Sequence, residues 1–192
     1  MNRPTVVAIS GSLRASSHTR LSLNRALEVA EQNGGSTELM DLREYDLPPI
    51  NPDDEEPVDA ERLTTTVREA DAVLLGTPVY HGSFSAPLKN ALDYCGFDEF
   101  EDTTVGLLAV AGGSFPVSAL DHLRTVCRAV NAWVLPHQAA IPNVYNQIEG
   151  DEIIDETIAE RVETLGERAV EFAQIEPDPP CFESEQNVWP AE

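Results

Sequence analysis

The sequence predicts a doubly wound α/β fold, in which helices cover both faces of a five-stranded parallel sheet. Five short segments with strand patterns alternate along the chain with segments of helical periodicity, which is the pattern of such a sheet. The first run, residues 5–9, shows no clean alternation, as expected for a parallel strand buried on both faces. Five strands favour the spatial order 2-1-3-4-5 in the middle of three layers.

The expected elements follow one another along the chain. We expect strands at residues 5–9, 37–42, 72–76, 105–111 and 133–135, and helices at residues 21–32, 58–70, 87–94, 118–131 and 151–173. Gly34 and Gly35 end the first helix. The last helix presents one apolar face, made of Ile154, Ile158, Val162, Leu165 and Ala169. The prolines and acids of residues 45–57 predict a long loop, and long loops in compact domains are often functional.

The chain of 192 residues fits one domain, residues 1–175, followed by an acidic tail that contains prolines, residues 176–192. No run of about 18 apolar residues occurs that could span a membrane. The first residues lead directly into a strand pattern rather than a signal peptide, which predicts a cytoplasmic protein. Cys95, Cys127 and Cys181 form no CxxC pair, so they indicate neither a disulfide framework nor a zinc site.

The net charge of −22 arises from 34 acidic and 12 basic residues, and Lys89 is the only lysine. Such acidity disfavours nucleic acids and anionic membranes as partners, because both carry the same sign of charge. It resembles the composition of proteins from salt-loving cells, where salt screens the repulsion between acidic side chains. The composition thus indicates a halophilic protein that works in a salt-rich solvent, and it does not indicate the protein's function.

Residues 10–20, with the sequence SGSLRASSHTR, join the first strand to the first helix and predict an anion-binding loop. Their hydroxyls and N–H groups lie at the positive end of a helix dipole, and Arg14 or Arg20 can add a charge-assisted bond to a phosphate. No Gly-Lys-Ser/Thr follows Gly11 and the glycine spacing does not match the dinucleotide fingerprint, so neither of those loops is indicated. The same residues also fit a helix N-cap and a polar turn.

The strand order brings three loops together. In the order 2-1-3-4-5, strands one, three and four are neighbours, so the loops at Gly11, Tyr80 and Gly112 meet at one crevice, the switch point where ligands of open α/β sheets bind. A phosphate at the first loop and glycines that allow close backbone approach in the other two describe a site for a flat phosphorylated molecule. Taken singly, each of the later loops also fits an ordinary turn.

Three ordered motifs are similar to those of the NADPH-dependent FMN reductase family, which includes quinone, azo-dye and chromate reductases with a flavodoxin-like fold. They are GSLR at residues 11–14 with residues 16–20, TPVYHGS at residues 77–83 and LKNALDY at residues 88–94. The resemblance extends from about residue 6 to residue 142. It implies bound FMN as the cofactor and NADPH or NADH as the electron donor.

The resemblance also implies which residues surround the flavin, with the phosphate in the first loop and the isoalloxazine ring between the other two. The implied cofactor-binding residues are Ser10, Ser12, Arg14, Ser16, Ser17, Thr19, Pro78, Val79, Tyr80, His81, Gly82, Ser83, Ala111, Gly112 and Gly113. Because the flavin carries the redox chemistry, no catalytic side chain is required, and His81 is the one candidate.

The second loop departs from the common family pattern Pro-Glu-Tyr-Asn-Gly, because Val79 and His81 stand in the Glu and Asn places. Backbone contacts with a flavin survive these changes, whereas contacts of the two family side chains do not carry over. The His81 imidazole could hydrogen-bond the ring or donate a proton to a reduced quinone. A solvent-facing loop histidine is the alternative that we favour.

Two further features have simple interpretations. Lys89 and Asp93 are four residues apart on a helix and are expected to pair. In the resembling family, residues 88–94 lie near a subunit interface, which implies a homodimer or homotetramer. Asp41, at the end of the second strand, is expected to be a solvated acid, since the glycine fingerprint that accompanies a ribose-binding acid is absent from the sequence.

We therefore expect an oxidoreductase in which NAD(P)H passes a hydride to N5 of FMN and is replaced by an acceptor, namely a flavin, a quinone, an azo compound or a metal oxyanion. The main alternative is a non-enzymatic electron carrier that resembles flavodoxin, and a flavin-free α/β protein is a third. Bleaching of the flavin by NADPH or NADH distinguishes the first two, and FMN uptake excludes the third. The acceptor and the donor preference stay open.

Overall fold

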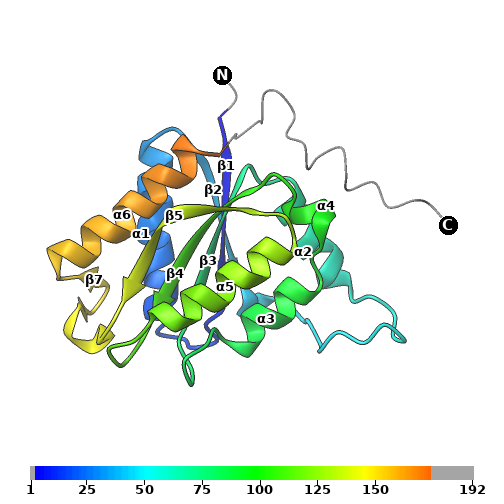
Figure 1. Cartoon of the computed structure of the whole chain (residues 1–192), viewed down its shortest axis with the longest axis horizontal. Coiled ribbons are helices and arrows are strands. Elements are labelled where there is room, and N and C mark those ends of the chain that lie inside the picture. Colours follow the sequence, from blue (N-terminus) through cyan, green and yellow to red (C-terminus); the bar gives the residue numbers. More distant parts are fainter. Residues whose placement is uncertain (1–2, 174–192) are drawn as a thin grey trace.

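A five-stranded parallel sheet with the order β2-β1-β3-β4-β5 organises the computed structural model, which describes residues 3–173 (Figure 1). The strands are β1 (Thr5–Ser10), β2 (Ser36–Asp41), β3 (Ala72–Pro78), β4 (Thr104–Val110) and β5 (Trp133–Ile141). Every pair of neighbouring strands runs parallel. The predicted fold class and strand order are confirmed.

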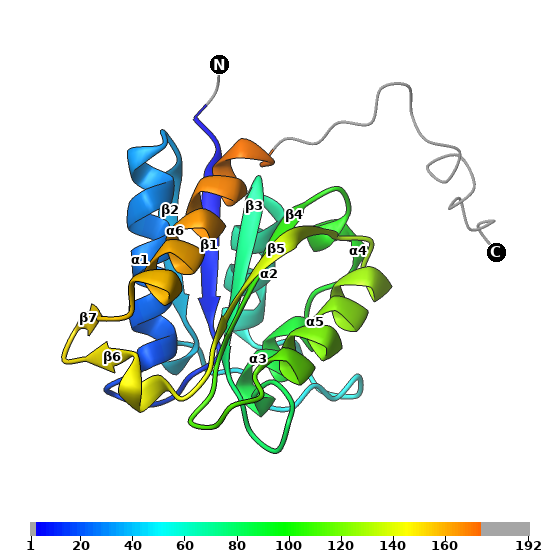
Figure 2. The same cartoon turned by 60° about the vertical axis from the view of Figure 1, so that its left-hand side comes forward.

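Helices cover both faces of the sheet and make three layers (Figures 1 and 2). α1 (His18–Gln32) and α6 (Glu156–Glu171) lie on one face, and α2 (Val58–Arg68), α3 (Ala86–Asp93), α4 (Phe97–Phe100) and α5 (Val117–Ala129) lie on the other. Two 3₁₀ turns, η1 (Leu42–Glu44) and η2 (Val144–Asn146), and a hairpin of β6 (Ile148–Glu149) and β7 (Glu152–Ile153) complete the described chain.

The central strands β3 and β4 are buried on both faces, as their apolar runs predict. Leu74 and Leu108 pack with α1 and α6, whereas their neighbours Leu75 and Leu107 pack with α2, α3 and α5. All four side chains are fully buried. Since successive side chains of a strand point to opposite faces, this alternation places a hydrophobic layer on each side of the sheet.

Helices α1 and α6 pack so closely that one position excludes a side chain. A Cβ atom on Gly166 of α6 would overlap the carbonyl oxygen of Ala26 in α1. Arg25 of α1 also pairs with Glu163 of α6, with 2.5 Å between Nη2 and Oε1. These two contacts hold the middle of α1 against α6.

Strand β5 is longer than predicted, because the proline and polar residues in its middle interrupt the apolar pattern on which the prediction rests. The prediction ends it at Leu135, whereas the strand continues to Ile141. Pro136 lies in a stretch where the register between β4 and β5 shifts. Proline is tolerated there because β5 is an edge strand and the irregular stretch does not need a ladder N–H from every residue.

The last helix is shorter than predicted. It begins at Glu156, and Ile154 lies before it rather than on its apolar face. Asp155 caps the helix by accepting a hydrogen bond from the N–H of Ile158 at 3.0 Å. Gly150, with a φ of 59°, turns the preceding β6–β7 hairpin. The helical spacing of apolar residues extends into this hairpin, so only the capping residue marks the true start.

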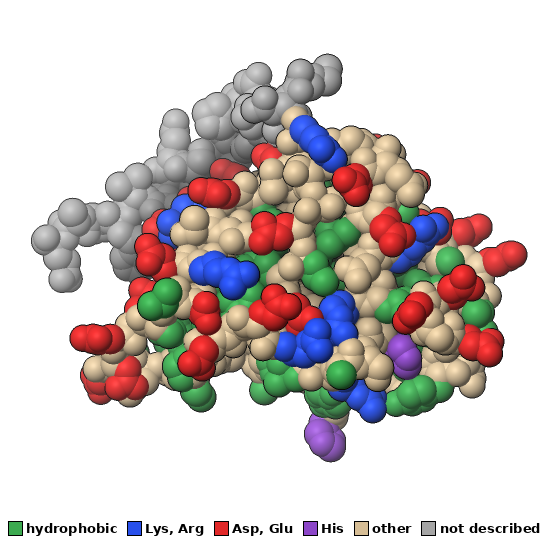
Figure 3. Space-filling view, turned by 180° about the vertical axis from the view of Figure 1, so that it is seen from behind, with side chains coloured by type: hydrophobic (Ala, Val, Ile, Leu, Met, Phe, Trp, Pro, Cys, Tyr) green, Lys and Arg blue, Asp and Glu red, His purple; other side chains and the backbone are tan. Residues whose placement is uncertain are grey.

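Acidic side chains are spread over the face of the molecule that Figure 3 shows, in keeping with the net charge of −22. Within residues 3–173, no helix combines the length and the apolar composition needed to cross a bilayer. The predicted tail, residues 176–192, and Cys181 lie outside the described residues.

Candidate functional site

The carboxyl ends of β1, β3 and β4 lie side by side, and each continues into one of the predicted loops. We call residues 11–17 the first loop, residues 79–85 the second loop and residues 111–116 the third loop. Figure 2 shows them together at the lower end of the sheet. The convergence that the strand order predicts is present in the structure.

Hydrogen bonds tie the first loop to the second. The N–H of Gly11 donates to the carbonyl of Gly76 at 2.8 Å. The hydroxyl of Ser85 donates to the carbonyl of Gly11 at 2.7 Å, while the Ser85 N–H donates to Oγ1 of Thr77 at 2.9 Å. A Cβ atom on residue 11 would lie 2.6 Å from Oγ of Ser85 and 2.7 Å from Cβ of Leu88. Only glycine fits at this junction.

The third loop is supported by the segment that follows β5. The N–H of Asn143 donates to the carbonyl of Gly113 at 2.9 Å. The ring of Tyr145 lies next to Gly112, with 3.4 Å between its Cε2 atom and the place of a Cβ atom on that glycine. Residues 143–145 therefore form a further side of the site, which the sequence analysis does not predict.

The first loop presents a row of unused hydrogen-bond donors. No backbone N–H from residue 12 to residue 19 donates to an acceptor within the described part of the chain. The hydroxyl of Ser10 is fully buried and has no hydrogen-bond partner there either. Ser12, Ser17 and Thr19 are also buried. Buried polar groups are normally paired, and free N–H groups at a helix N-terminus are suited to an anion.

The helix-cap interpretation of this loop is correct for one residue. Ser17 is the N-cap of α1 and accepts a hydrogen bond from the N–H of Arg20 at 3.1 Å, which starts the helix at His18, earlier than predicted. A hydroxyl can accept and donate at the same time, so the Ser17 O–H can still donate to an anion. Ser16, by contrast, is exposed. The cap and the anion site are compatible.

Arg14 of the first loop and Arg20 of α1 have different surroundings. Arg14 is exposed and has no carboxylate partner among residues 3–173, and the Tyr145 hydroxyl beside it raises the pKa of Arg14. Arg20 instead pairs with Asp41, with 3.2 Å between Nη1 and Oδ2. Asp41 is only 5% exposed and pairs with Arg43 as well, so the expectation of a solvated acid is wrong. Arg20 and Arg43 thus both bind the Asp41 carboxylate. Of Arg14 and Arg20, it is Arg14 that stays available to an external anion.

Two hydrogen bonds close the second loop into a tight turn. The N–H groups of Tyr80 and Ser83 each donate to the carbonyl of the other residue, both at 3.0 Å. The central residues His81 and Gly82 have φ values of 50° and 78°. Positive φ at both central positions is characteristic of a type I′ turn, for which Asn-Gly is a favoured pair. His81 is exposed, so the change from Asn to His alters a turn position rather than a buried contact.

The other predicted residues of the second and third loops are of two kinds. Some pack against the core, and others have backbone N–H groups that make no hydrogen bond within the described structure. Pro78 ends β3, and the Val79 side chain packs against the core. Ala111 is buried and donates its N–H to the carbonyl of Ile141 at 2.9 Å. By contrast, the N–H groups of residues 81–82 and 112–115 donate to no acceptor in the described structure. These groups are available to the polar edge of a flat ligand.

Three residues at the site were missed by the sequence analysis. Tyr145 lies edge-on to His18, with 5.8 Å between the ring centroids, and Nδ1 of His122 in α5 lies 3.0 Å from Oγ of Ser83. Neither has a local signal, because Tyr145 follows the unpredicted part of β5 and His122 lies within a helix. Ser85 had one, since a serine shortly before a proline marks a helix cap.

The third motif lies in α3 and anchors the long loop that follows β2. The predicted pair of Lys89 and Asp93 is confirmed. On the same helix, Asn90 and Tyr94 donate to the carbonyl of Pro48 at 3.1 and 2.7 Å. The motif therefore holds the beginning of the long loop against α3, the helix that follows the second loop.

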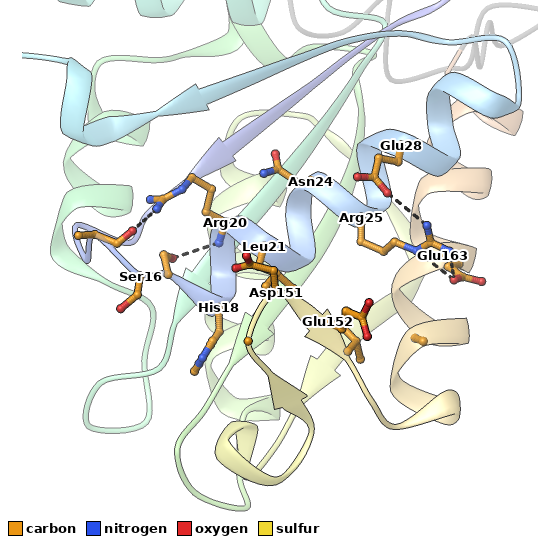
Figure 4. Close-up of a pocket in the computed structure, with 15 residues that line it drawn as sticks. Ser16, His18, Arg20, Leu21, Asn24, Arg25, Glu28, Asp151, Glu152 and Glu163 are labelled. Atoms are coloured by element: carbon orange, nitrogen blue, oxygen red, sulfur yellow. Dashed lines mark hydrogen bonds and ion pairs between the residues drawn. The ribbon is translucent and has the colours of Figure 1, made fainter.

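A hollow of about 650 Å³ lies between the first loop, α1, the β6–β7 hairpin and α6 (Figure 4). Its charged lining residues are Arg20, Arg25, Glu28, Asp151, Glu152 and Glu163. Both arginines are already paired with carboxylates, and the four acids give the hollow a negative balance. Ser16 and Ser17 of the first loop also line this hollow, but its negative balance does not suit a phosphate on that side of the loop. The candidate site is therefore the side of the first loop that meets the second and third loops.

Two of the cysteines are excluded from nucleophilic chemistry. Cys95 and Cys127 are buried, and burial raises the pKa of each thiol to about 12. Such thiols stay protonated at neutral pH, whereas the thiolate is the nucleophile. Neither cysteine is therefore a candidate nucleophile.

The fold defines a doubly wound α/β protein in which three loops meet at the switch point of the sheet, where ligands of open α/β sheets bind. A model of the NADPH-dependent FMN reductase family matches residues 4–146. The FMN-dependent NADPH-azoreductase of Staphylococcus saprophyticus is 34% identical over 138 residues, which are 69% of this chain and 73% of that protein. The azoreductase of Staphylococcus aureus is 35% identical over the same shares. The chain belongs to the NADPH-dependent FMN reductase family and is an oxidoreductase that uses FMN and a nicotinamide donor.

Solved structures of flavin oxidoreductases share the fold. The apo form of the NADH:FMN oxidoreductase EMOB has a TM-score of 0.74 at 20% identity, over 91% of this chain and 92% of that chain. FerB, a NAD(P)H:(acceptor) oxidoreductase from Paracoccus denitrificans, has a TM-score of 0.75 at 23% identity, over 88% of this chain and 97% of that chain. The predicted flavodoxin-like fold is confirmed.

Proposed function

We propose that the crevice holds FMN with its phosphate in the first loop. The observation that carries this proposal is the row of free N–H groups in residues 12–19 beside a buried strand end whose Ser10 hydroxyl has no partner in the described structure. The proposed phosphate ligands are Ser10, Ser12, Arg14, Ser16, Ser17 and Thr19. The helix dipole, the hydroxyls and the guanidinium of Arg14 together suit a phosphate dianion.

We propose that the second and third loops border the flavin ring. The residues concerned are Pro78, Val79, Tyr80, His81, Gly82, Ser83, Ala111, Gly112 and Gly113. The unused N–H groups of residues 81–82 and 112–115 support this, since a flavin ring has carbonyl and nitrogen acceptors along one edge. Pro78, Val79 and Ala111 contribute by packing, because they belong to the strand ends and the core.

When bound, FMN supplies the redox chemistry by taking a hydride from the nicotinamide and passing electrons to an acceptor. The residues of this chain bind, orient and exclude water. Tyr80, Phe115 and Tyr145 are 53%, 84% and 66% exposed, and their rings offer apolar surface around the crevice. Planar molecules stack favourably on such rings.

We propose that the acceptor is a small planar molecule, an azo compound or a quinone. The apolar surface of the three aromatic side chains supports this class, and so do the azoreductase names of the relatives that are 34% and 35% identical. The net charge of −22 repels anions, which disfavours a metal oxyanion or free FMN as the acceptor at low salt.

We also propose a cytoplasmic homo-oligomer, a dimer or a tetramer, that assembles through α3. The support is that some side chains of this helix bind the chain's own long loop while others are exposed. Asn90 and Tyr94 hold the chain's own loop, whereas Lys89 and Asp93 are exposed and Phe97 beyond the helix is 52% exposed. Sedimentation equilibrium at high salt tests this proposal, and a monomer at all concentrations would refute it.

An anaerobic absorbance titration tests the proposed function. The FMN-loaded protein is titrated with NADPH and, separately, with NADH, and the visible flavin band is followed. We expect the band to bleach with an equimolar amount of the preferred donor, while free FMN at the same concentration reacts far more slowly. A band that persists with both donors would indicate an electron carrier, and failure to take up FMN would refute the cofactor site.

Reoxidation of the reduced protein then identifies the acceptor. The panel contains an azo dye, a quinone, FMN and chromate. We expect the azo dye and the quinone to reoxidise the protein at least about tenfold faster than chromate at low salt. Repeating the series at high salt is the matched control, because screening should raise the rates of the anionic acceptors selectively. Chromate as the fastest acceptor at low salt would contradict the proposed class.

A further inference from the structure

Arg20 binds the backbone of the first loop from its outer side. Its Nη1 atom donates to the carbonyl of Arg14 at 3.3 Å, and its Nη2 atom donates to the carbonyl of Ala15. The same guanidinium pairs with Asp41 at the end of β2. Figure 4 shows Arg20 reaching from α1 back toward the loop. One side chain thus connects the first loop to the neighbouring edge strand of the sheet.

Asp41 is a firm anchor for this contact. Its side chain is 7% exposed, and Nε of Arg43 lies 3.0 Å from both of its oxygens. Burial by itself would raise the pKa of Asp41, but the hydrogen bonds of Arg43 and the positive charges of Arg43 and Arg20 lower this pKa below its usual value. The carboxylate therefore stays charged at neutral pH and holds both guanidinium groups.

Holding two carbonyls also sets the direction of the next two N–H groups. In a trans peptide unit the C=O and the N–H bonds point in opposite directions. Because the carbonyls of Arg14 and Ala15 turn toward Arg20, the N–H groups of Ala15 and Ser16 point away from it. These are two of the loop donors that have no acceptor in residues 3–173.

We propose that Arg20 is a positioning residue for the flavin phosphate, because it orients the N–H donors of Ala15 and Ser16 without binding the phosphate itself. The inference rests on the proposed FMN site. The guanidinium of Arg20 is occupied by Asp41 and the two carbonyls and is only 18% exposed. It arranges the loop before the cofactor arrives, and a preorganised site loses less conformational entropy on binding.

Comparison of FMN with riboflavin tests this role, because riboflavin has the same ring and no phosphate. The affinity of the full-length apoprotein for each ligand is measured from the quenching of flavin fluorescence. Arg20→Ala should weaken FMN binding about tenfold and leave riboflavin binding within about twofold of wild type. Equal losses for both ligands would indicate general damage and would overturn the proposal. Unchanged FMN affinity would overturn it as well.

Two further variants make the test specific. Arg25→Ala removes a guanidinium from the same helix, but its hydrogen-bond and ion-pair partners within residues 3–173 are Glu28 and Glu163 rather than the first loop. It should leave the ratio of the two affinities unchanged. Arg20→Lys keeps the charge next to Asp41 but loses the planar fork that holds two carbonyls, so it should also lower the preference for FMN. If Arg20→Ala does not fold, the lysine variant decides the question.

The wild-type protein separates the failure of this inference from the failure of the proposed function. If wild type binds FMN no more tightly than riboflavin, the phosphate does not bind in the first loop and both proposals fail. If wild type prefers FMN and both Arg20 variants keep that preference, only the positioning role fails. The result that supports the proposal is a preference for FMN over riboflavin that wild type and Arg25→Ala show and that the Arg20 variants lose.

Discussion

The hydroxyl of Ser85 donates a hydrogen bond to the carbonyl of Gly11 at 2.7 Å and so joins the first loop to the N-terminal end of α3. Ser85 also caps α3 by accepting a hydrogen bond from the N–H of Leu88 at 3.4 Å. Both Ser85 and Gly11 are buried. The proposed phosphate loop and the loop beside the flavin ring are thus held in one arrangement by a single side chain.

Ser85→Ala should destabilise the protein and weaken FMN binding. The substitution leaves the buried carbonyl of Gly11 without this partner and removes a helix cap, which together cost about 1–3 kcal/mol of unfolding free energy. Urea denaturation and FMN titration measure the two effects. Thr125→Ala removes an exposed hydroxyl from α5 and is the control, expected within about 0.5 kcal/mol of wild type. A Ser85→Ala protein as stable as this control would contradict the assigned role.

Arg14→Ala should weaken flavin retention more than turnover. Arg14 is the loop arginine without a carboxylate partner among the described residues, so its removal takes away the proposed charge contact with the phosphate. We expect the FMN dissociation constant to rise about tenfold and kcat at saturating FMN to change less than about twofold. Arg128→Ala, an exposed arginine of α5, is the matched control. Equal FMN affinity in the Arg14 variant counts against the phosphate site.

His81→Asn should preserve FMN binding and leave the protein at least as stable as wild type. His81 has a φ of 50° in a type I′ turn, and asparagine adopts this conformation readily. His81→Val places a β-branched residue there and should cost about 1–3 kcal/mol of unfolding free energy. Thermal unfolding and FMN titration of both variants check this. A large loss of turnover in the asparagine variant alone would show that the imidazole itself takes part.

The ion pairs of Asp41 should make stability depend on pH in a defined direction. The folded-state pKa of Asp41 is lowered, so its contribution is fully present above the unfolded value of about 3.9 and is lost as the pH falls through the folded value. At neutral pH, Asp41→Asn should cost about 2–3 kcal/mol, less than a fully buried pair, because Arg20 and Arg43 keep some solvent contact.

Urea unfolding of wild type and Asp41→Asn at fixed ionic strength measures this dependence. The difference between the two proteins isolates one carboxylate from the many others that titrate in the same range. We expect a constant difference from neutral pH down to about pH 4 and a shrinking one below it. A difference that grows as the pH falls would have the wrong sign and would falsify the assignment.

Gly166→Ala should force α1 and α6 apart. Its methyl group would overlap the carbonyl of Ala26, and overpacking of this kind costs about 1–3 kcal/mol. Differential scanning calorimetry of the variant should show a lower Tm. Gly113→Ala is the stability control, because nothing lies within 4 Å of a Cβ atom at that position. Equal transition temperatures for the two variants would contradict the packing argument.

Elements with a strong local pattern were predicted well, and elements held by distant partners were not. β1, β3 and β4 were found because each is a nearly uninterrupted apolar run, whereas β2 has the mixed sequence STELMD. β5 was cut short because Pro136 and the polar residues after it belong to a strand only through pairing with β4. The start of α6 was misplaced because hairpin and helix both carry apolar residues, and Asp155 alone separates them.

The candidate site shows the same division. The serines, glycines and arginines of the three loops stand in contiguous motifs, so the sequence points to them directly. Tyr145 reaches the site because the end of β5 lies beside β4, and His122 because α5 packs beside the second loop. No short-range pattern encodes either proximity.

By itself, the sequence determined the fold class, the strand order and the loops that meet at the switch point, because apolar periodicity and loop composition are local properties of the chain. Only the tertiary structure decided the different roles of Arg14, in the first loop, and Arg20, in the first turn of α1. Arg20 and Asp41 are separated by 21 positions in the chain, and their ion pair forms because β2 ends beside the first loop. That pairing turns Arg20 toward the loop backbone and leaves Arg14 for the ligand, since a guanidinium that is buried against a carboxylate is not available to a second anion.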